Sequence, residues 1–198
     1  MKPSSRFEAK SIHAFLKILG SDSATPGGGS AAALAAAIGA ALAEMVSRLN
    51  QKRRPSKDAG RRIGWLSQNR QKFARLMTQD AEAFDKLKKR LSQKNSKSDL
   101  DLAFKATGAV PYEICALSVK TLELALKEIP RTSRWLASDL AEAAILLEAA
   151  CLSGRLNVEV NLKGMKNKRF VKEKRNQLGR LEEKAARLKN KLMGVLAR

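Results

Sequence analysis

The sequence of 198 residues predicts an all-α fold, built as a single multihelical bundle. Apolar residues recur every three or four positions through most of the chain, which is the period of an amphipathic helix. No stretch alternates between apolar and polar residues for long, so strands are not expected. No repeat or second-domain boundary is visible, and residues 1–198 are therefore expected to form one domain.

Each expected helix is bounded by residues that interrupt helical structure. A loop over residues 21–29 precedes the second helix, and the polar stretch SQKNSKSD separates the third from the fourth. Pro111 is expected to kink the fourth helix, and residues 155–164 to form a short extended or helical piece. Four residues are expected to end helices: Gly20, Pro55, Pro130 and Gly154. The expected helices cover residues 5–19, 30–50, 57–92, 99–128, 138–153 and 168–196.

The helix expected over residues 30–50 has two different faces. Alanines and Gly39 form a face nearly without side chains, which would let neighbouring helices approach closely and would make this helix central. Ser30 is expected to cap its N-terminus. The three glycines before it lie where unpaired N–H groups and the helix dipole can receive an anion or a carbonyl; an ordinary turn explains the same residues. The opposite face is an apolar stripe of Leu34, Ile38, Leu42, Met45 and Leu49.

Asp80 lies on the apolar side of the third helix, which is unusual for a carboxylate. A charge on such a stripe must pair, bind a ligand or take up a proton, because burying it bare is costly. Asp80 is therefore a candidate general acid or base with a raised pKa. The alternative is a structural carboxylate bonded to an arginine or to a neighbouring helix end. The residues expected to form the buried seam are Leu66, Phe73, Met77, Phe84, Leu87 and Leu91.

Two further polar groups have both structural and functional interpretations. Asp139, three residues before Glu142, fits a capping box at a helix start. Asn157 and Asn161 are four residues apart and share a face if their segment is helical. Their amides could hold the edge of a heterocycle or satisfy buried backbone groups.

The net charge of +20 favours anionic partners, including nucleic acid or another polyanion. Residues 165–198 are expected to form a basic amphipathic C-terminal helix that packs on the body or on a twin subunit. A single histidine and two cysteines without metal-binding spacing argue against a metal site and a Ser-His-Asp triad. No signal peptide or membrane span is expected, which favours a cytoplasmic protein.

Four motifs, TPGGGSAAALAAAIGAAL, DAEAF, SDL and NVEVNL, stand in an order that resembles the cyclodeaminase/cyclohydrolase family. That family includes the C-terminal domain of formiminotransferase-cyclodeaminase and free-standing bacterial methenyltetrahydrofolate cyclohydrolases. The resemblance covers Phe7 to Val171. It implies an all-helical homodimer, a tetrahydrofolate derivative as substrate and no prosthetic group.

The resemblance also implies that Asp80 is the catalytic carboxylate and that the glycine loop lines the folate site. The substrate-binding residues expected on this basis are Pro26, Gly27, Gly28, Gly29, Ser30, Asp139, Asn157 and Asn161. A polyglutamate tail or another anion is expected to contact Lys52, Arg53, Arg54 and Lys57. The chain departs from the family pattern at Arg134–Ala137, where members often have Gly-Asn before SDL.

Three functions are compatible with these residues. The first is hydrolysis of 5,10-methenyltetrahydrofolate to 10-formyltetrahydrofolate, favoured because no formiminotransferase domain precedes this sequence. The second is a formiminotetrahydrofolate cyclodeaminase that releases ammonia. The third is a non-catalytic basic helical dimer that binds nucleic acid.

Overall fold

A computed structural model describes residues 6–94 and 96–197, and it confirms the all-α fold. The helices in the described part of the chain are α1 (Ile12–Leu19), α2 (Gly28–Arg53), α3 (Lys57–Leu91), α4 (Lys97–Leu126), α5 (Ala137–Lys163) and α6 (Lys168–Met193). Short 3-10 turns lie at Phe7–Ala9, Ile129–Arg131, Arg134–Leu136 and Gly194–Ala197.

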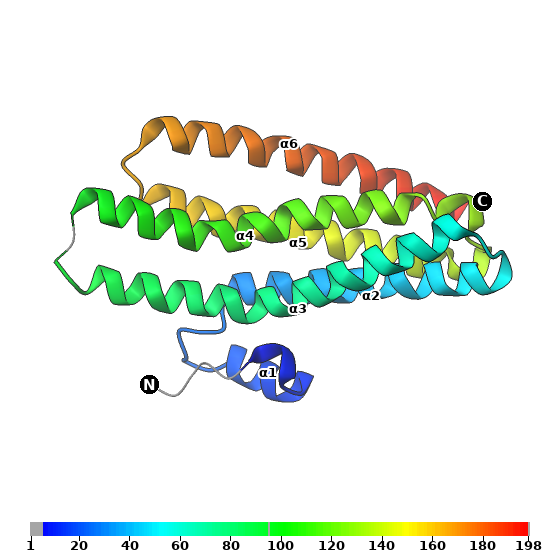
Figure 1. Cartoon of the computed structure of the whole chain (residues 1–198), viewed down its shortest axis with the longest axis horizontal. Coiled ribbons are helices and arrows are strands. Elements are labelled where there is room, and N and C mark those ends of the chain that lie inside the picture. Colours follow the sequence, from blue (N-terminus) through cyan, green and yellow to red (C-terminus); the bar gives the residue numbers. More distant parts are fainter. Residues whose placement is uncertain (1–5, 95, 198) are drawn as a thin grey trace.

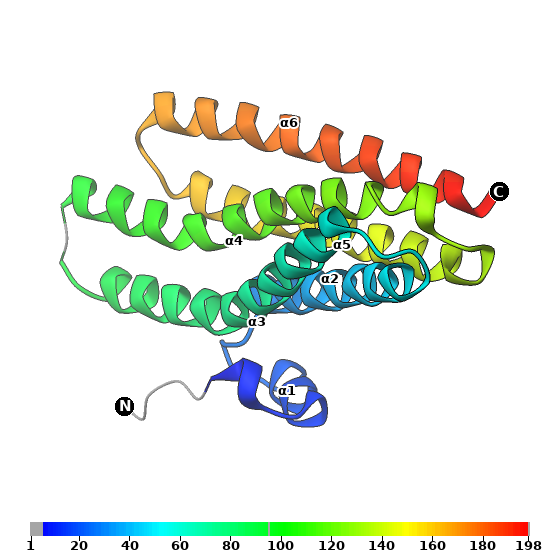
Figure 2. The same ribbon diagram turned by 45° about the vertical axis from the view of Figure 1, so that its right-hand side comes forward.

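Four long antiparallel helices form the centre of the bundle. α2 packs against α3 and α5, and α4 packs against the same two helices. In Figure 1, α3 and α4 lie in front of α2 and α5, and the short α1 lies below them. α6 runs along α4 and α5, as Figure 2 also shows. The buried faces of α2 to α6 join, with Phe7 and Phe15, into one hydrophobic cluster.

Several helix boundaries differ from the sequence prediction. The first helix starts at Ile12, capped by the Ser11 side chain, and a 3-10 turn precedes it; Ser5 lies outside the described residues. Gly154 does not end α5, which continues to Lys163 and so includes residues 155–163. A β-carbon at Gly154 would lie 2.8 Å from the Pro111 carbonyl oxygen. Gly154 therefore allows α4 and α5 to approach closely, rather than terminating α5.

The two faces of α2 are arranged differently from the expectation that other helices surround it. Its small face is buried, with Ala32, Ala36, Ala40 and Ala43 in the core and Gly39 close to the Ala143 carbonyl of α5. Three members of its larger apolar stripe, Ile38, Met45 and Leu49, are exposed in the single chain. α2 is also long and apolar enough to cross a membrane, but 56% of its most apolar window is buried in the bundle.

The prediction that six residues of α3 form a buried seam is only partly confirmed. Leu66, Phe73, Met77 and Leu87 are buried, whereas Phe84 and Leu91 are exposed. On α6, the residues Leu178, Ala185, Leu188 and Leu192 are buried against α4 and α5. The basic C-terminal helix thus packs on the body of its own chain, and its cations occupy the remaining faces.

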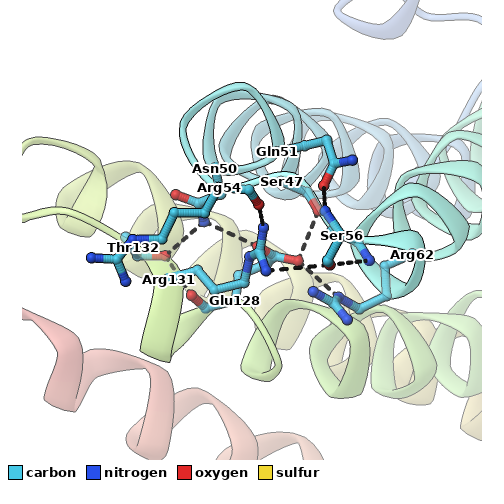
Figure 3. A network of polar contacts seen from close by, with 10 residues as sticks. Ser47, Asn50, Gln51, Arg54, Ser56, Arg62, Glu128, Arg131 and Thr132 are labelled. Carbon is cyan, nitrogen blue, oxygen red and sulfur yellow. Dashed lines mark hydrogen bonds and ion pairs between the residues drawn. The ribbon is translucent and has the colours of Figure 1, made fainter.

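A buried polar network joins α2, α3 and the end of α4 at one end of the bundle (Figure 3). Its centre is Glu128, which is fully buried and lies 2.8 Å from Nε of Arg62. Ser47 and Asn50 of α2 donate hydrogen bonds to the same carboxylate at 2.8 and 3.0 Å. Burial raises the pKa of Glu128, but the hydrogen bonds from Asn50, Arg62 and Ser47 outweigh it, so the net shift of the pKa is downward.

Candidate active site

The glycine loop leads directly into the N-terminus of α2, as the sequence predicts. The helix begins at Gly28, and its N-cap residue, Gly27, has no side chain with which to cap it. Ser30 is therefore not the N-cap, contrary to expectation, but lies within the first turn. Its hydroxyl donates to the Met77 carbonyl of α3 at 2.7 Å, which ties the two helices together.

Asp80 approaches this first turn from α3. Its Oδ2 atom lies 3.3 Å from Oγ of Ser30, and the Ser30 backbone N–H also donates to the carboxylate. A β-carbon built on Gly29 would lie 2.1 Å from Oδ1 of Asp80. The glycine at position 29 thus provides the space that the carboxyl group occupies. The contact with the N-terminus of α2 agrees with the interpretation of Asp80 as a structural carboxylate bonded to a neighbouring helix end. The carboxyl group also lies at the wall of a cavity, as a functional role requires.

The environment of Asp80 favours its neutral form. Burial raises the pKa of this carboxyl group, and the two hydrogen bonds from Ser30 only partly oppose the shift. No ion pair to Asp80 is formed within the described parts of the chain. The Ser30 hydroxyl has one proton for two acceptors, the Met77 carbonyl and the Asp80 carboxylate; when it donates to Met77, its oxygen can accept a hydrogen bond from a protonated Asp80. The site therefore accommodates both protonation states.

Asn157 and Asn161 of α5 form the opposite wall. Nδ2 of Asn157 donates to the Ser153 carbonyl at 2.8 Å, and Nδ2 of Asn161 donates to the Asn157 carbonyl at 2.9 Å. In the part of the chain that the structure describes, neither Oδ1 atom accepts a hydrogen bond. The two asparagines thus leave two carbonyl-type acceptors available to a ligand.

These groups surround a cavity of about 200 Å³. Among the residues proposed from sequence, it brings together Gly27, Gly28, Gly29, Asp80, Asn157 and Asn161. Pro26 is buried in the adjoining loop, and Ser30 contacts Asp80 from behind the wall. The residues that sequence reasoning did not assign to the site are Ala24, Thr25, Phe84, Leu87, Phe104, Thr107, Pro111 and Val160.

Among these missed residues, three carried a usable signal because they lie in the quoted motifs: Thr25 begins TPGGGS, Val160 lies in NVEVNL, and Phe84 ends DAEAF, one helical turn after Asp80. A second, larger cavity of about 590 Å³ lies between the end of α3 and the start of α4. It shares Leu87 and Thr107 with the Asp80 cavity and includes Lys86 and Arg90. The small cavity thus has a larger neighbour along α3.

Five residues proposed from sequence do not lie at this cavity in the single chain. Asp139 is on the first turn of α5, about 27 Å along that helix from Asn157, and it does not cap α5. The cations proposed to bind the tail, Lys52, Arg53, Arg54 and Lys57, lie at the end of α2 and the start of α3. That end is about 36 Å from Gly28. Arg53 donates to the Arg131 carbonyl, and the Arg54 carbonyl accepts from Arg131 (Figure 3).

The described residues contain no group of three or more His, Cys, Asp or Glu side chains that could hold a metal ion. What they do place at the cavity is one carboxyl group with a raised pKa, a helix N-terminus and two amides. Fold and site together define an all-helical protein with a partly buried carboxyl group at the wall of a small cavity, an arrangement that suits acid–base chemistry.

Comparison with known proteins identifies the family. The family model of formiminotransferase-cyclodeaminase matches residues 11–180, so the chain belongs to this family. A methenyltetrahydrofolate cyclohydrolase of Methylorubrum extorquens is 28% identical over 195 residues, covering 92% of this chain and 94% of that protein. The formimidoyltransferase-cyclodeaminase of Rattus norvegicus is 32% identical over 188 residues. That match covers 88% of this chain but only 35% of the rat protein.

A solved structure supports the same conclusion. The crystal structure of formiminotetrahydrofolate cyclodeaminase from Thermotoga maritima superposes with a TM-score of 0.89 at 27% identity, over 96% of this chain and 97% of that one. The resemblance predicted from the four motifs is thereby confirmed. The chain is an enzyme of the cyclodeaminase and cyclohydrolase type, in folate one-carbon metabolism.

Proposed function

We propose that this protein hydrolyses 5,10-methenyltetrahydrofolate to 10-formyltetrahydrofolate, with Asp80 as the acid–base residue. The observation that supports this most strongly is the single carboxyl group of raised pKa at the wall of the glycine-lined cavity. The match to a methenyltetrahydrofolate cyclohydrolase along 94% of that protein supports the choice of reaction.

The substrate carries its own electrophile, because the carbon between N5 and N10 belongs to a delocalised amidinium cation. A water molecule attacks this carbon while the ionised Asp80 accepts one proton from it. The C–N5 bond then breaks, and the protonated Asp80 returns its proton to N5. The remaining hydroxyl group loses its proton to solvent as the formyl carbonyl forms on N10. No prosthetic group is needed for these steps.

The raised pKa of Asp80 fits this cycle. In the empty site, burial favours the neutral carboxyl group. A bound amidinium cation would favour the ionised form by direct attraction, which prepares the base for the attack. When the cation is consumed, the same burial keeps the proton on Asp80, and it is transferred when the departing N5 becomes basic enough to accept it. General acid–base help of this kind typically contributes about 10²–10⁴ to the rate.

The walls of the cavity suggest how the ring system is held. The unused Oδ1 atoms of Asn157 and Asn161 can accept hydrogen bonds from the N–H groups along the pterin edge. The first turn of α2 has no side chains at Gly28 and Gly29, so a flat ring can lie against the backbone there. The three glycines thus have two roles, since Gly29 also makes room for Asp80.

We also propose that the protein is a homodimer that uses the outer faces of α2 and α5. These faces expose Ile38, Met45 and Leu49 on α2 and Ile145, Leu152, Leu156 and Val160 on α5. Contiguous exposed apolar residues on one face mark an interaction site in most proteins of known structure.

A formiminotetrahydrofolate cyclodeaminase is the second candidate, favoured by the structural match to the Thermotoga maritima enzyme. In that reaction N10 attacks the formimino carbon and ammonia leaves. A neutral Asp80 would donate the proton that the leaving amine requires, and burial keeps it neutral.

Two assays separate these functions. Hydrolysis predicts that the purified protein accelerates the loss of methenyl absorbance, and that Asp80→Asn lowers this rate by about 10²-fold or more. Asp85→Asn is the matched control, because Asp85 lies on the same helix but does not line the cavity. Ammonia release from the formimino substrate without methenyl hydrolysis would support the second candidate. Absence of both reactions, with DNA binding that falls steeply as salt rises, would instead support nucleic-acid binding by the basic surface.

A further inference from the structure

A third cavity, which we name the aromatic cavity, lies between α4, α5 and the first two turns of α6. Its volume is about 130 Å³. Val158 and Leu162 of α5 line it and are buried, whereas Lys105 and Ala109 of α4 are exposed and form its rim. An engineered apolar cavity of about 150 Å³ in another protein binds benzene. The aromatic cavity therefore has room for one six-membered ring.

Contacts between α4 and α5 separate the aromatic cavity from the Asp80 cavity. Phe104 and Asn161 border both cavities. A β-carbon built on Gly108 would lie 3.3 Å from Cβ of Asn161, so the two helices touch between the cavities. At the end of α5, the ring of Phe104 packs on the backbone of Gly164. The aromatic cavity is thus a neighbour of the candidate active site and not an extension of it.

Three aromatic rings line this cavity, and they favour a ligand that is itself a ring. The rings belong to Phe104 and Tyr112 of α4 and to Phe170 of α6. Aromatic rings that meet edge to face, or that stack with an offset, gain free energy beyond that of apolar burial alone. An aromatic ligand would make such contacts, whereas an aliphatic chain would gain only from burial.

Two ammonium groups lie over the same rings. Nζ of Lys105 lies 5.0 Å from the ring centre of Phe170, and Nζ of Lys174 lies 5.6 Å from the same centre. Nζ of Lys174 is also 4.0 Å from the ring centre of Tyr112. Among the residues that the structure describes, neither lysine forms an ion pair with a carboxylate. Lys174 donates instead to the neutral side chain of Gln177, at 2.8 Å.

The electrostatics of Lys174 favour an anion at this place. Burial lowers the pKa of Lys174, Glu173 opposes this shift, and the neighbouring Lys105 adds to it. The carboxylate of Glu173 accepts a hydrogen bond from Gln177 and forms no ion pair with Lys174. A cation that is partly removed from water and faces a second cation is stabilised by a nearby anion. One carboxylate at the rim would attract both lysines.

We propose that the aromatic cavity is a binding site for a small aromatic carboxylate. The ring of the ligand lies among Phe104, Tyr112 and Phe170, and its carboxylate lies at the rim with Lys105 and Lys174. The alternative is that the two lysines only cover the aromatic rings by cation–π contacts, which requires no anion. This inference does not depend on the reaction proposed for Asp80.

Benzoate is the probe, and the methyl resonances of the methionines report where it binds. Met165 lines the aromatic cavity, whereas the carbonyl of Met77 accepts from Ser30 beside Asp80. The ring current of bound benzoate should move the Met165 resonance in a saturable way and leave that of Met77 in place. For so small a ligand we expect a dissociation constant of about 1 mM. Met165→Leu assigns the resonance.

Two other small molecules separate the roles of charge and ring in the wild-type protein. Benzamide has the shape of benzoate without its charge, and we expect it to bind at least about 10-fold more weakly, because hydrogen bonds between ions are stronger than those to a neutral group. Acetate has the charge without the ring, and it should leave the Met165 resonance unmoved at the same concentrations.

Substitution of the two lysines tests their roles directly. Lys105→Gln and Lys174→Gln keep most of each side chain but remove its charge, and each should weaken benzoate binding by about 10-fold. Lys172→Gln is the matched control, because Lys172 is an exposed cation of α6 that does not line the aromatic cavity. It should change the dissociation constant by less than about 2-fold. Circular dichroism establishes that each variant is folded.

Four results would overturn the proposal. The first is a Met165 resonance that does not move up to about 20 mM benzoate, roughly twenty times the expected constant. The second is a shift of Met77 alone, which would place benzoate in the Asp80 cavity. The third is equal affinity for benzamide and benzoate, and the fourth is unchanged affinity in both lysine variants. The benzamide comparison needs no variant to fold, and no result depends on whether the protein hydrolyses a folate.

Discussion

Gly29→Ala tests the central geometric feature of the site with the smallest possible change. The added carbon would lie 2.1 Å from Oδ1 of Asp80, where an ordinary contact begins at 3.4 Å. The carboxyl group must therefore retreat by about 1.3 Å, and a displacement of about 1 Å in a catalytic group can cost about 100-fold in rate. We expect the methenyl hydrolysis rate, as kcat/KM, to fall by about that factor.

The fold should survive this substitution. Alanine is favoured over glycine within a helix by up to about 1 kcal/mol, which partly offsets the local crowding. Gly28→Ala is the matched comparison, because its added carbon would lie 3.5 Å from the Asn157 side chain, an ordinary contact. Because Gly28 borders the proposed ring site but does not contact Asp80, we expect this variant to raise KM and to leave kcat close to wild type. Gly60→Ala, which meets nothing within 4 Å, controls for the helix effect alone.

The assay is the decay of methenyl absorbance, and circular dichroism with thermal melting of each variant establishes that it is folded. If Gly29→Ala and Gly28→Ala lose activity equally, the contact between residue 29 and Asp80 does not control catalysis. If Gly29→Ala keeps full activity, then Asp80 does not need the position seen here, and its assignment as the acid–base residue is wrong.

Two further predictions concern stability. Burial raises the pKa of Asp80 in the folded state, so ionisation of this group weakens the fold as pH rises toward that pKa. Asp80→Asn should therefore have a higher melting temperature than wild type at pH 8, by about 2–4 °C for each kcal/mol of unfolding free energy gained. The difference in melting temperature should vanish in acid, where Asp80 is neutral in both the folded and the unfolded state. Equal melting temperatures at both pH values would contradict this. Glu128→Ala should destabilise the fold by about 3–5 kcal/mol in urea at pH 7, because Arg62 loses its buried partner. The folded pKa of Glu128 is lowered, so its contribution is present above the ordinary glutamate pKa and is lost as pH falls through the folded pKa. A loss below about 1 kcal/mol, or one that does not shrink in acid, would refute the role of the network.

Local sequence signals predicted helices well but failed at residues whose role depends on a neighbour. Gly154 looks like a helix stop because glycine weakens helices, yet α5 continues through it to meet Pro111 of α4. The alanine face of α2 packs in the core as expected, but the larger apolar stripe, which was expected to be covered because α2 is central, exposes Ile38, Met45 and Leu49 in the single chain. Both errors arise because periodicity reports which residues share a face, and not which face meets another helix.

The site was predicted where chemistry and sequence proximity coincide. Asp80 on an apolar stripe, and glycines before a helix, are each unusual enough to be noticed in one chain. The cations of residues 52–57 were assigned to the substrate's anionic tail because of their charge alone. Charge does not indicate where a residue lies in the folded chain. Phe104, Thr107 and Pro111 are ordinary helix residues that become part of the cavity only because α4 crosses α3 and α5 there.

The sequence by itself thus determines the helices, the unusual position of Asp80 on an apolar stripe and the glycine loop. These features depend on short-range periodicity and on the chemistry of individual side chains. Only the tertiary structure places Asp80 against Gly29 and brings Asn157 and Asn161 to the opposite wall of the cavity. It also places the cations of residues 52–57 far from this cavity. The physical reason is that helix crossings are set by the shapes of packed surfaces, which involve residues far apart in the chain.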